Sequence, residues 1–202
     1  MKSSEGDGSA ISLFVSLAKR GTMSVLLETE RLLLRSPRAA DISKFVPLIN
    51  DFDVVKNLSR VPYPYTEDDG CAFITKITES IAAGTDYAFA ILLKPDTYIG
   101  TCGVHPERGW EFGYWFGRPY WGKGYATEAG RRVLQFAFEE LKAERLQASW
   151  FYDNPKSGRV LEKLGFKPDG EGEIASLSRG VTVNCHVVAL DRATYMTRKM
   201  MS

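Results

Sequence analysis

The chain has 202 residues, of which 44% are hydrophobic and 25% charged, and its formal net charge is +1. These values are ordinary for a globular protein, and the length suffices for one well-buried core in one domain or, less commonly, two. The near-neutral charge and the lack of any run of Lys or Arg give no reason to expect a nucleic-acid partner.

Three cysteines, Cys71, Cys102 and Cys185, are scattered along the chain without CxxC spacing. They are too few for a disulfide framework and too dispersed for a zinc site. We therefore expect free thiols in a cytoplasmic protein that holds no metal.

The first 22 residues differ in character from the rest of the chain. A small, polar stretch at residues 2–8 is followed by a short apolar run at residues 11–18. This run is too short for a bilayer, which takes about 20 residues, and its flanking charges do not suit a secretion signal. We expect residues 1–22 to be an accessory extension, with Met23 as an alternative start and residues 23–202 as a single domain without a membrane span.

The organised part of the chain opens with a strand and two helices. The apolar run at residues 32–35 is typical of a buried strand. Residues 39–50 have apolar side chains at helical spacing, and Pro47 is expected to kink this helix or end it early. Thr66 is a good N-cap and is followed by three acidic residues, so a second helix is predicted from there to about Gly84.

Strands and a long helix follow in the middle of the chain. Alternating apolar residues predict three strands, at residues 87–93, 98–104 and 110–116. A helix is predicted at residues 125–141 and a further strand at 146–152, and this order of elements favours a parallel strand pair with a crossover helix. Glu128 is expected to meet Arg131 or Arg132 on the outer face of the helix.

The last part of the chain predicts a short helix and a closing hairpin. The helix spans residues 155–164, and Gly165 in the left-handed conformation lets Phe166 fold back onto it. Residues 173–178 and 181–190 form the antiparallel hairpin. Together the elements predict one mixed α/β domain built around a central sheet.

The turn that precedes the long helix carries the clearest chemical signal. Gly122 and Gly124 flank Lys123 directly before the helix. The first turn of a helix has N–H groups without intrahelical partners and a partial positive charge, so it suits a phosphate group. A plain tight turn is the alternative. The sequence has neither a nucleoside-triphosphate P-loop nor a dinucleotide GxGxxG fingerprint.

Three segments together, 111–116, 121–126 and 154–166, resemble the GNAT superfamily of acyl-CoA-dependent N-acetyltransferases, with the closest likeness to its RimJ/RimL ribosomal-protein branch. The resemblance runs from Leu27 to about residue 196. One position departs from the family signature, because Trp121 stands where Gln or Arg is usual. The resemblance implies a twisted, mixed, mostly antiparallel sheet of about seven strands flanked by about four helices.

The resemblance also implies that acetyl-CoA is the cosubstrate. Its pyrophosphate would rest on the turn, its pantetheine arm would run beside the aromatic strand, and the Asn154 amide would hold the arm or nearby backbone. The implied cofactor-binding residues are Tyr114, Trp115, Phe116, Trp121, Gly122, Lys123, Gly124, Tyr125, Ala126, Thr127 and Asn154.

Two residues are implied in catalysis. Glu111 would take the proton of the attacking amine, or would simply pair with a cation at the sheet edge. Ser157 would protonate the leaving thiolate, or would cap its helix. Glu171 and Glu173 are weaker candidates for the base. His105 is expected to be a histidine at a loop or strand end, and His186, which is alone on its strand, is not expected to bind a metal.

The acceptor is a primary amine whose identity the sequence leaves open. At pH 7 a lysine amine is neutral only to roughly 0.04%, whereas an N-terminal α-amine is neutral to roughly 10–15% and needs only a modest base. A protein N-terminus is therefore favoured. A small-molecule acceptor such as an antibiotic or polyamine, and a non-catalytic acyl-CoA-binding module, are the alternatives. The chain is expected to be a monomer or a homodimer.

Overall fold

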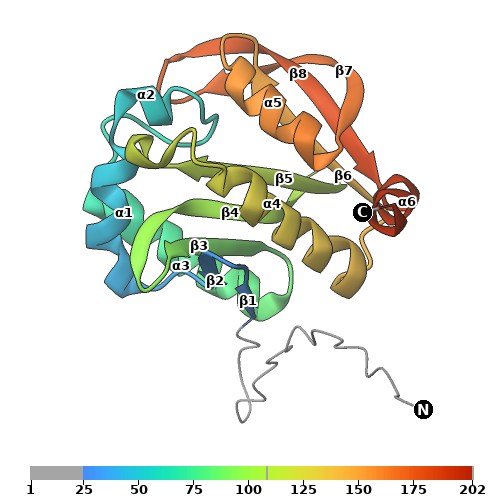
Figure 1. The fold of residues 1–202 in the computed structure, drawn as a ribbon. Helices are drawn as coiled ribbons and strands as arrows, with labels where there is room; N and C mark the ends of the chain where they lie inside the picture. The colour runs from blue at the N-terminus through green and yellow to red at the C-terminus, as the bar shows by residue number, and fades with distance from the viewer. Residues whose placement is uncertain (1–24, 108, 202) are drawn as a thin grey trace, which may run out of the picture.

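An eight-stranded sheet forms the centre of the molecule (Figure 1). The structure is a computed structural model and describes residues 25–107 and 109–201. The strand order is β1-β2-β3-β4-β5-β6-β8-β7, in which β5 and β6 are parallel and all other neighbours are antiparallel. This mixed, mostly antiparallel sheet with helices around it confirms the expected fold class. The predicted extension at residues 1–22 lies outside the described residues.

The strands are β1 (Leu26–Glu28), β2 (Leu32–Arg35), β3 (Tyr87–Leu93), β4 (Thr97–Glu107), β5 (Gly109–Phe116), β6 (Arg145–Phe151), β7 (Lys167–Ser176) and β8 (Val181–Asp191). The helices are α1 (Ile42–Ile49), α2 (Phe52–Val55), α3 (Glu67–Ala83), α4 (Tyr125–Gln135), α5 (Pro155–Leu164) and α6 (Arg192–Met200). Short 3₁₀ turns occupy Ala39–Asp41 and Arg118–Tyr120, and a π-helical segment, Phe136–Glu140, continues α4. None of the described helices is long and apolar enough to cross a membrane.

The described chain has one strand and two helices more than expected. Strand β1 has three residues and α2 has four, which is too short for any periodicity to appear in the sequence. Helix α6 buries none of its residues, and most of its side chains are polar or basic. Strand β7 begins earlier than predicted, at Lys167, because a register shift between Pro168 and Gly170 accommodates residues that are unfavourable in strands.

Several local predictions are confirmed. Helix α1 contains Pro47 and ends two residues later, at Ile49. The Thr66 side chain accepts a hydrogen bond from the Asp69 N–H at 3.2 Å, and α3 ends at Gly84 in the left-handed conformation. Gly165 closes α5 in the same way. The three cysteines are free thiols.

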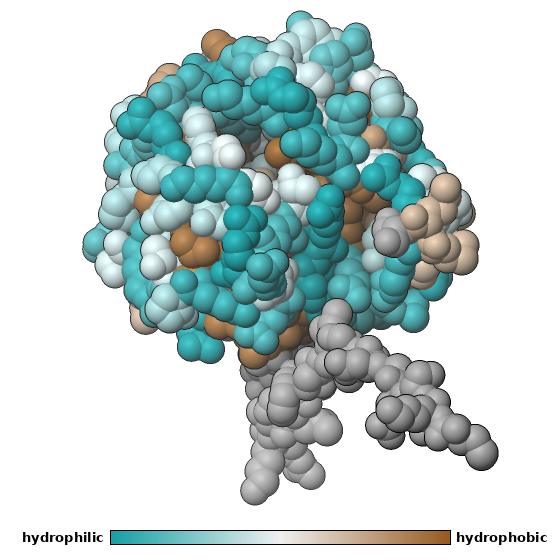
Figure 2. Space-filling model, viewed as in Figure 1, coloured by the Kyte–Doolittle hydropathy of each residue, from teal (hydrophilic) through white to brown (hydrophobic). Residues whose placement is uncertain are grey.

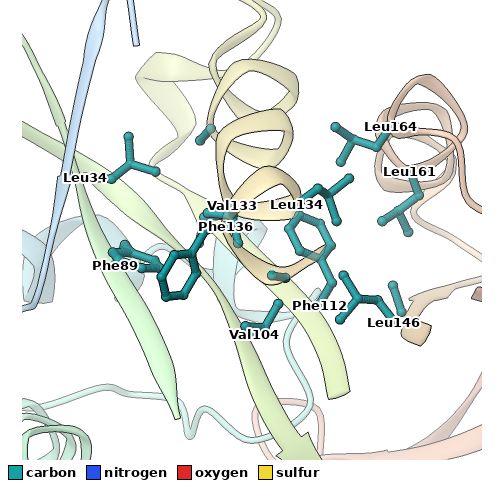
Figure 3. Packing of buried hydrophobic residues seen from close by; sticks show 14 of the residues in the cluster. Leu34, Phe89, Val104, Phe112, Val133, Leu134, Phe136, Leu146, Leu161 and Leu164 are labelled. Carbon is teal, nitrogen blue, oxygen red and sulfur yellow. The ribbon is translucent and has the colours of Figure 1, made fainter. Parts of the chain in front are cut away.

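The helices cover both faces of the sheet. Helices α4 and α5 pack on one face, where Val133 and Leu134 of α4 and Leu161 and Leu164 of α5 meet Phe112 and other sheet residues (Figure 3). Helices α1 and α3 pack on the opposite face around Phe45 and Tyr98. Because each face is buried separately, the side chains of one strand alternate between two hydrophobic layers.

A buried ion pair fastens β2 to the segment that leads into α1. The Arg35 guanidinium donates to both carboxylate oxygens of Asp41, at 2.7 and 2.8 Å, and the Arg38 N–H donates to the same carboxylate. The side chain of Asp41 is 2% exposed. Burial alone would raise the pKa of Asp41, but the hydrogen bonds from Arg35 and Arg38 outweigh it and hold the pKa below its ordinary value.

We expect Asp41→Asn to lower the free energy of unfolding by about 3 kcal/mol, because it leaves the Arg35 charge buried without a counter-ion. Urea unfolding at pH 7 measures this loss. Since the Asp41 pKa is depressed in the folded state, its stabilisation is complete above about pH 4 and disappears as the pH falls further.

Asp96→Asn is the matched control, because the Lys44–Asp96 ion pair is exposed and such pairs contribute less than about 1 kcal/mol. Equal stability of wild type and Asp41→Asn would contradict the importance of the buried pair.

Candidate active site

The neighbouring parallel strands β5 and β6 separate shortly after they begin. They pair only at Trp110 with Leu146 and Glu111 with Gln147, although β5 continues to Phe116. Beyond Glu111 the backbone of β5 therefore lacks a strand partner on this side. A cleft of about 760 Å³ opens where the strands separate.

The cleft is lined by side chains from both faces of the sheet. Phe112 and Tyr114 point toward α4 and α5, since Phe112 packs against Phe166 with ring centroids 5.6 Å apart and the Tyr114 hydroxyl reaches Ser157. Glu111 and Trp115 alternate with them and point to the opposite face. All four line the cleft. The opening thus connects one face of the sheet with the other.

The predicted glycine turn lies at this cleft. Gly122 and Gly124 have φ of +74° and +83°, values that favour glycine, and α4 begins directly after them at Tyr125. Gly124 is the N-cap and offers no capping side chain, so the first-turn N–H groups stay available to a ligand. The surface over α4 and α5 is predominantly hydrophilic, with hydrophobic residues visible between the polar ones (Figure 2).

Every predicted site residue lines the cleft except Lys123. The Lys123 ammonium lies 5.9 Å from the centre of the ring of Tyr120, a residue that does line the cleft. The role of Lys123 in binding the phosphate stays a prediction.

Trp121 joins the turn to the end of β5. Its indole N–H donates to the Phe116 carbonyl at 2.6 Å, and the Lys156 ammonium lies 5.8 Å from the centre of a Trp121 ring. At the position where the family usually has Gln or Arg, this tryptophan fixes the distance between the turn and the strand.

Glu128 fastens the turn from the other side, and the predicted pairing with Arg131 or Arg132 is wrong. Its carboxylate accepts from the Thr29 hydroxyl and from the Arg31 Nε, both at 2.6 Å, because the β1–β2 loop lies beside the start of α4. Arg31 also donates to the Lys123 carbonyl at 3.1 Å. Burial would raise the pKa of Glu128, but the hydrogen bonds from Thr29 and Arg31 prevail and hold it below its ordinary value.

Ser157 stands near the start of α5, opposite Tyr114. The two hydroxyl oxygens are 2.8 Å apart. Asn154 is the N-cap of α5 and accepts from the Ser157 N–H at 3.4 Å, so Ser157 is not itself the cap. Burial raises the pKa of the Tyr114 phenol, and the hydrogen bond with Ser157 only partly offsets this effect. The phenol therefore keeps its proton at neutral pH.

Glu111 forms the ion pair that the sequence had suggested as its alternative role. Its carboxylate lies 2.9 Å from the Arg60 guanidinium and stays 31% exposed. Arg60 belongs to the loop before α3, and no sequence pattern had marked it. The weaker base candidates, Glu171 and Glu173, do not line the cleft.

The two histidines lie on different strands. His105 lies near the end of β4, two residues before the strand ends at Glu107, and it pairs with Glu111 of β5. His186 of β8 stacks on Tyr152 with centroids 4.2 Å apart. Within residues 25–107 and 109–201, no group of three or more His, Cys, Asp or Glu residues is arranged to hold a metal ion.

The fold and cleft agree with comparisons with known proteins. The family model of the acetyltransferase (GNAT) domain matches residues 31–167, which is more than half of the chain. The chain therefore belongs to the GNAT family and is an N-acetyltransferase. It is 29% identical, over 174 residues, to the uncharacterized N-acetyltransferase p20 of Bacillus licheniformis, covering 84% of this chain and 97% of that protein.

Solved structures show the same fold. An acetyltransferase (GNAT family) from Bacillus anthracis matches with a TM-score of 0.73 and 25% identity, covering 84% of this chain and 99% of that one. A ribosomal-protein-S5-alanine acetyltransferase from Vibrio fischeri has a TM-score of 0.73 at 20% identity, with coverages of 83% and 97%. A Vibrio cholerae spermidine N-acetyltransferase in complex with CoA and spermine has a TM-score of 0.71 at 20% identity, with coverages of 83% and 99%.

Proposed function

We propose that this chain transfers the acetyl group of acetyl-CoA to a primary amine, specifically a protein N-terminal α-amine as in the RimJ/RimL branch. The observation that carries the proposal is the cleft through the sheet. It has an anion-binding turn along its wall, and Glu111 and Ser157 face it from opposite sides of the sheet.

The turn suits the diphosphate of CoA. The N–H groups of the first turn of α4 supply hydrogen bonds and positive potential. Lys156, Arg159 and Lys163 of α5 line the same cleft and add cationic side chains. Beyond Gly124 a shallow groove continues between Arg131 and Lys163, which suits the 3′-phosphate of the coenzyme.

The separated strands suit the pantetheine arm. This arm carries two amide groups, each of which offers a donor and an acceptor. The backbone of β5 between Phe112 and Phe116 lacks a partner strand on the cleft side and supplies the complementary groups. The arm would thus replace β6 as the hydrogen-bonding neighbour of β5 and carry the thioester toward Glu111.

Deprotonation of the amine and protonation of the thiolate take place on opposite faces of the sheet. The amine attacks the thioester carbonyl from the Glu111 side, and the nitrogen loses a proton toward the Glu111 carboxylate. The carbon–sulfur bond then breaks, the thiolate takes the proton of the Ser157 hydroxyl, and the serine oxygen is reprotonated from solvent in the cleft. The Tyr114 and Ser157 hydroxyl oxygens are 2.8 Å apart, and with the phenol as the donor the serine proton is free to point into the cleft.

An α-amine suits this site better than a lysine or polyamine. A carboxylate is in general a modest base for an amine proton, because the reference pKa of a carboxyl group lies far below that of an amine. An α-amine, neutral to roughly 10–15% at pH 7, requires no more than that. Because the spermidine enzyme has a similar fold, polyamines are retained as the competing acceptor class.

Thiol release from acetyl-CoA tests the proposal directly. The acceptor panel consists of peptides beginning with Ala, Ser or Met, an N-terminally blocked peptide containing lysine, and spermidine. We expect release with at least one free α-amine and little with the blocked peptide. Faster release with spermidine would reassign the acceptor to small amines, and tight CoA binding without release for any acceptor would favour a non-catalytic binding module.

Gly122→Ala tests the diphosphate site. Gly122 has φ of +74° and Gly180, in the β7–β8 turn, has φ of +66°, and a Cβ at either position would meet no atom within 4 Å. Both alanine variants should therefore lose about 1 kcal/mol of unfolding free energy. Only Gly122→Ala should weaken CoA binding, by about tenfold in calorimetry, because only that methyl group enters the anion-binding turn. Equal CoA affinities would contradict the assignment.

Ser157→Ala tests the protonation of the thiolate. We expect turnover to fall on the order of 100-fold while CoA affinity changes less than about twofold. Tyr114→Phe should give a smaller loss, because Ser157 then keeps its proton but not its orientation. An equal loss of turnover and affinity, or no loss of turnover, would remove Ser157 from the mechanism.

A further inference from the structure

Three polar residues form a row across the face of the sheet that bears Glu111. His105 of β4 lies directly opposite Glu111 of β5 in the antiparallel register. Asp86 precedes β3, and its carboxylate lies 2.7 Å from the His105 Nδ1. Side chains of directly opposed residues point to the same face, with Cβ atoms about 5 Å apart. The row therefore runs from Asp86 through His105 to the carboxylate at the cleft.

The imidazole is oriented by this contact. An ionised carboxylate only accepts hydrogen bonds, so Asp86 selects the tautomer in which Nδ1 carries the proton. The other ring nitrogen, Nε2, is then left with a free lone pair. Nε2 points over Gly113, where an added Cβ would stand 3.8 Å from it. Because Gly113 lines the cleft and has no side chain, nothing attached to that residue covers Nε2.

We propose that Asp86 and His105 form a positioning and proton-accepting pair behind Glu111. This inference depends on the proposed acetyl transfer. As the amine nitrogen bonds to the thioester carbon, its proton passes to the Glu111 carboxylate and on to the His105 Nε2. Asp86 then stabilises the imidazolium, while the carbon–sulfur bond breaks and the thiolate is protonated from Ser157. After the amide product leaves, the imidazolium returns its proton to solvent, and the Ser157 oxygen regains a proton from solvent.

The charges around His105 are consistent with this role. Asp86 faces it from the segment before β3, and Glu111 faces it from β5. Arg60, which reaches Glu111 from the loop before α3, is the cation of the group. The His105 side chain is 27% exposed, so a proton can leave it to solvent. An imidazole changes charge between pH 5 and 8, which suits deprotonation of an α-amine better than a carboxylate alone does.

The test compares His105→Gln with wild type in thiol release from acetyl-CoA, with whichever panel peptide the wild type acetylates. We expect kcat at pH 8 to fall about 100-fold, with CoA affinity changed less than about twofold. Protonation of the acceptor amine at low pH slows wild type and variant by the same factor. It therefore cancels in the ratio of the wild-type rate to the His105→Gln rate. Because an imidazole accepts a proton only in its neutral form, this ratio should fall as the pH is lowered from 8 to 5.

Imidazole rescue separates a proton-accepting role from a structural one. Added imidazole should restore turnover of His105→Ala in proportion to the concentration of its neutral form. His186→Gln is the matched control, because it removes the other of the two histidines in the chain and leaves Asp86 and Glu111 in place. It should keep the wild-type rate and pH dependence.

Three results would contradict the proposed role of Asp86 and His105. They are full activity of His105→Gln, a rate ratio that does not change with pH, and loss of activity in His105→Ala without rescue by imidazole. A wild-type enzyme that releases no thiol with any acceptor would instead refute the proposed function, so the two failures are distinguishable.

Discussion

The site depends on one constraint, the early separation of two parallel strands. Strands β5 and β6 share only two paired positions before they part. A separation inside a sheet is costly unless the exposed backbone groups find other partners. Here helices pack on both faces of the sheet, and β5 has an edge without a strand partner that faces a cleft. The anion-binding turn, the hydroxyl pair and the carboxylate all take their positions from this opening.

Side-chain contacts around the opening hold the glycine turn, the start of α4 and the start of α5 in place. Trp121 ties the turn to the end of β5, Glu128 ties the start of α4 to the β1–β2 loop, and Asn154 caps the helix that carries Ser157. These contacts come from segments far apart in the sequence. Catalytic groups must be held closely in place for proton transfer to be efficient, and rigid elements hold them better than loops do.

Much of the fold and the glycine turn of the cleft could be predicted from local patterns. The glycine turn, the left-handed Gly165 and the Thr66 cap are set by a few adjacent residues, so the sequence shows them directly. The ion-pair partners of Glu128 and Glu111 could not be predicted. Arg31 and Arg60 are distant from them in sequence, and many other basic residues could have paired with either carboxylate. The continuation of β4 past His105 depended on how far two strands stay paired, which local patterns do not show.

The central claim is that CoA lies in the cleft between β5 and β6, and hydrogen–deuterium exchange with and without CoA tests it most directly. The account predicts slower exchange for the amides of residues 122–127, which would bind the diphosphate, and for those of residues 112–116, which would bind the pantetheine arm. Saturating CoA that leaves both segments unchanged, or that protects only segments away from the cleft, would contradict it.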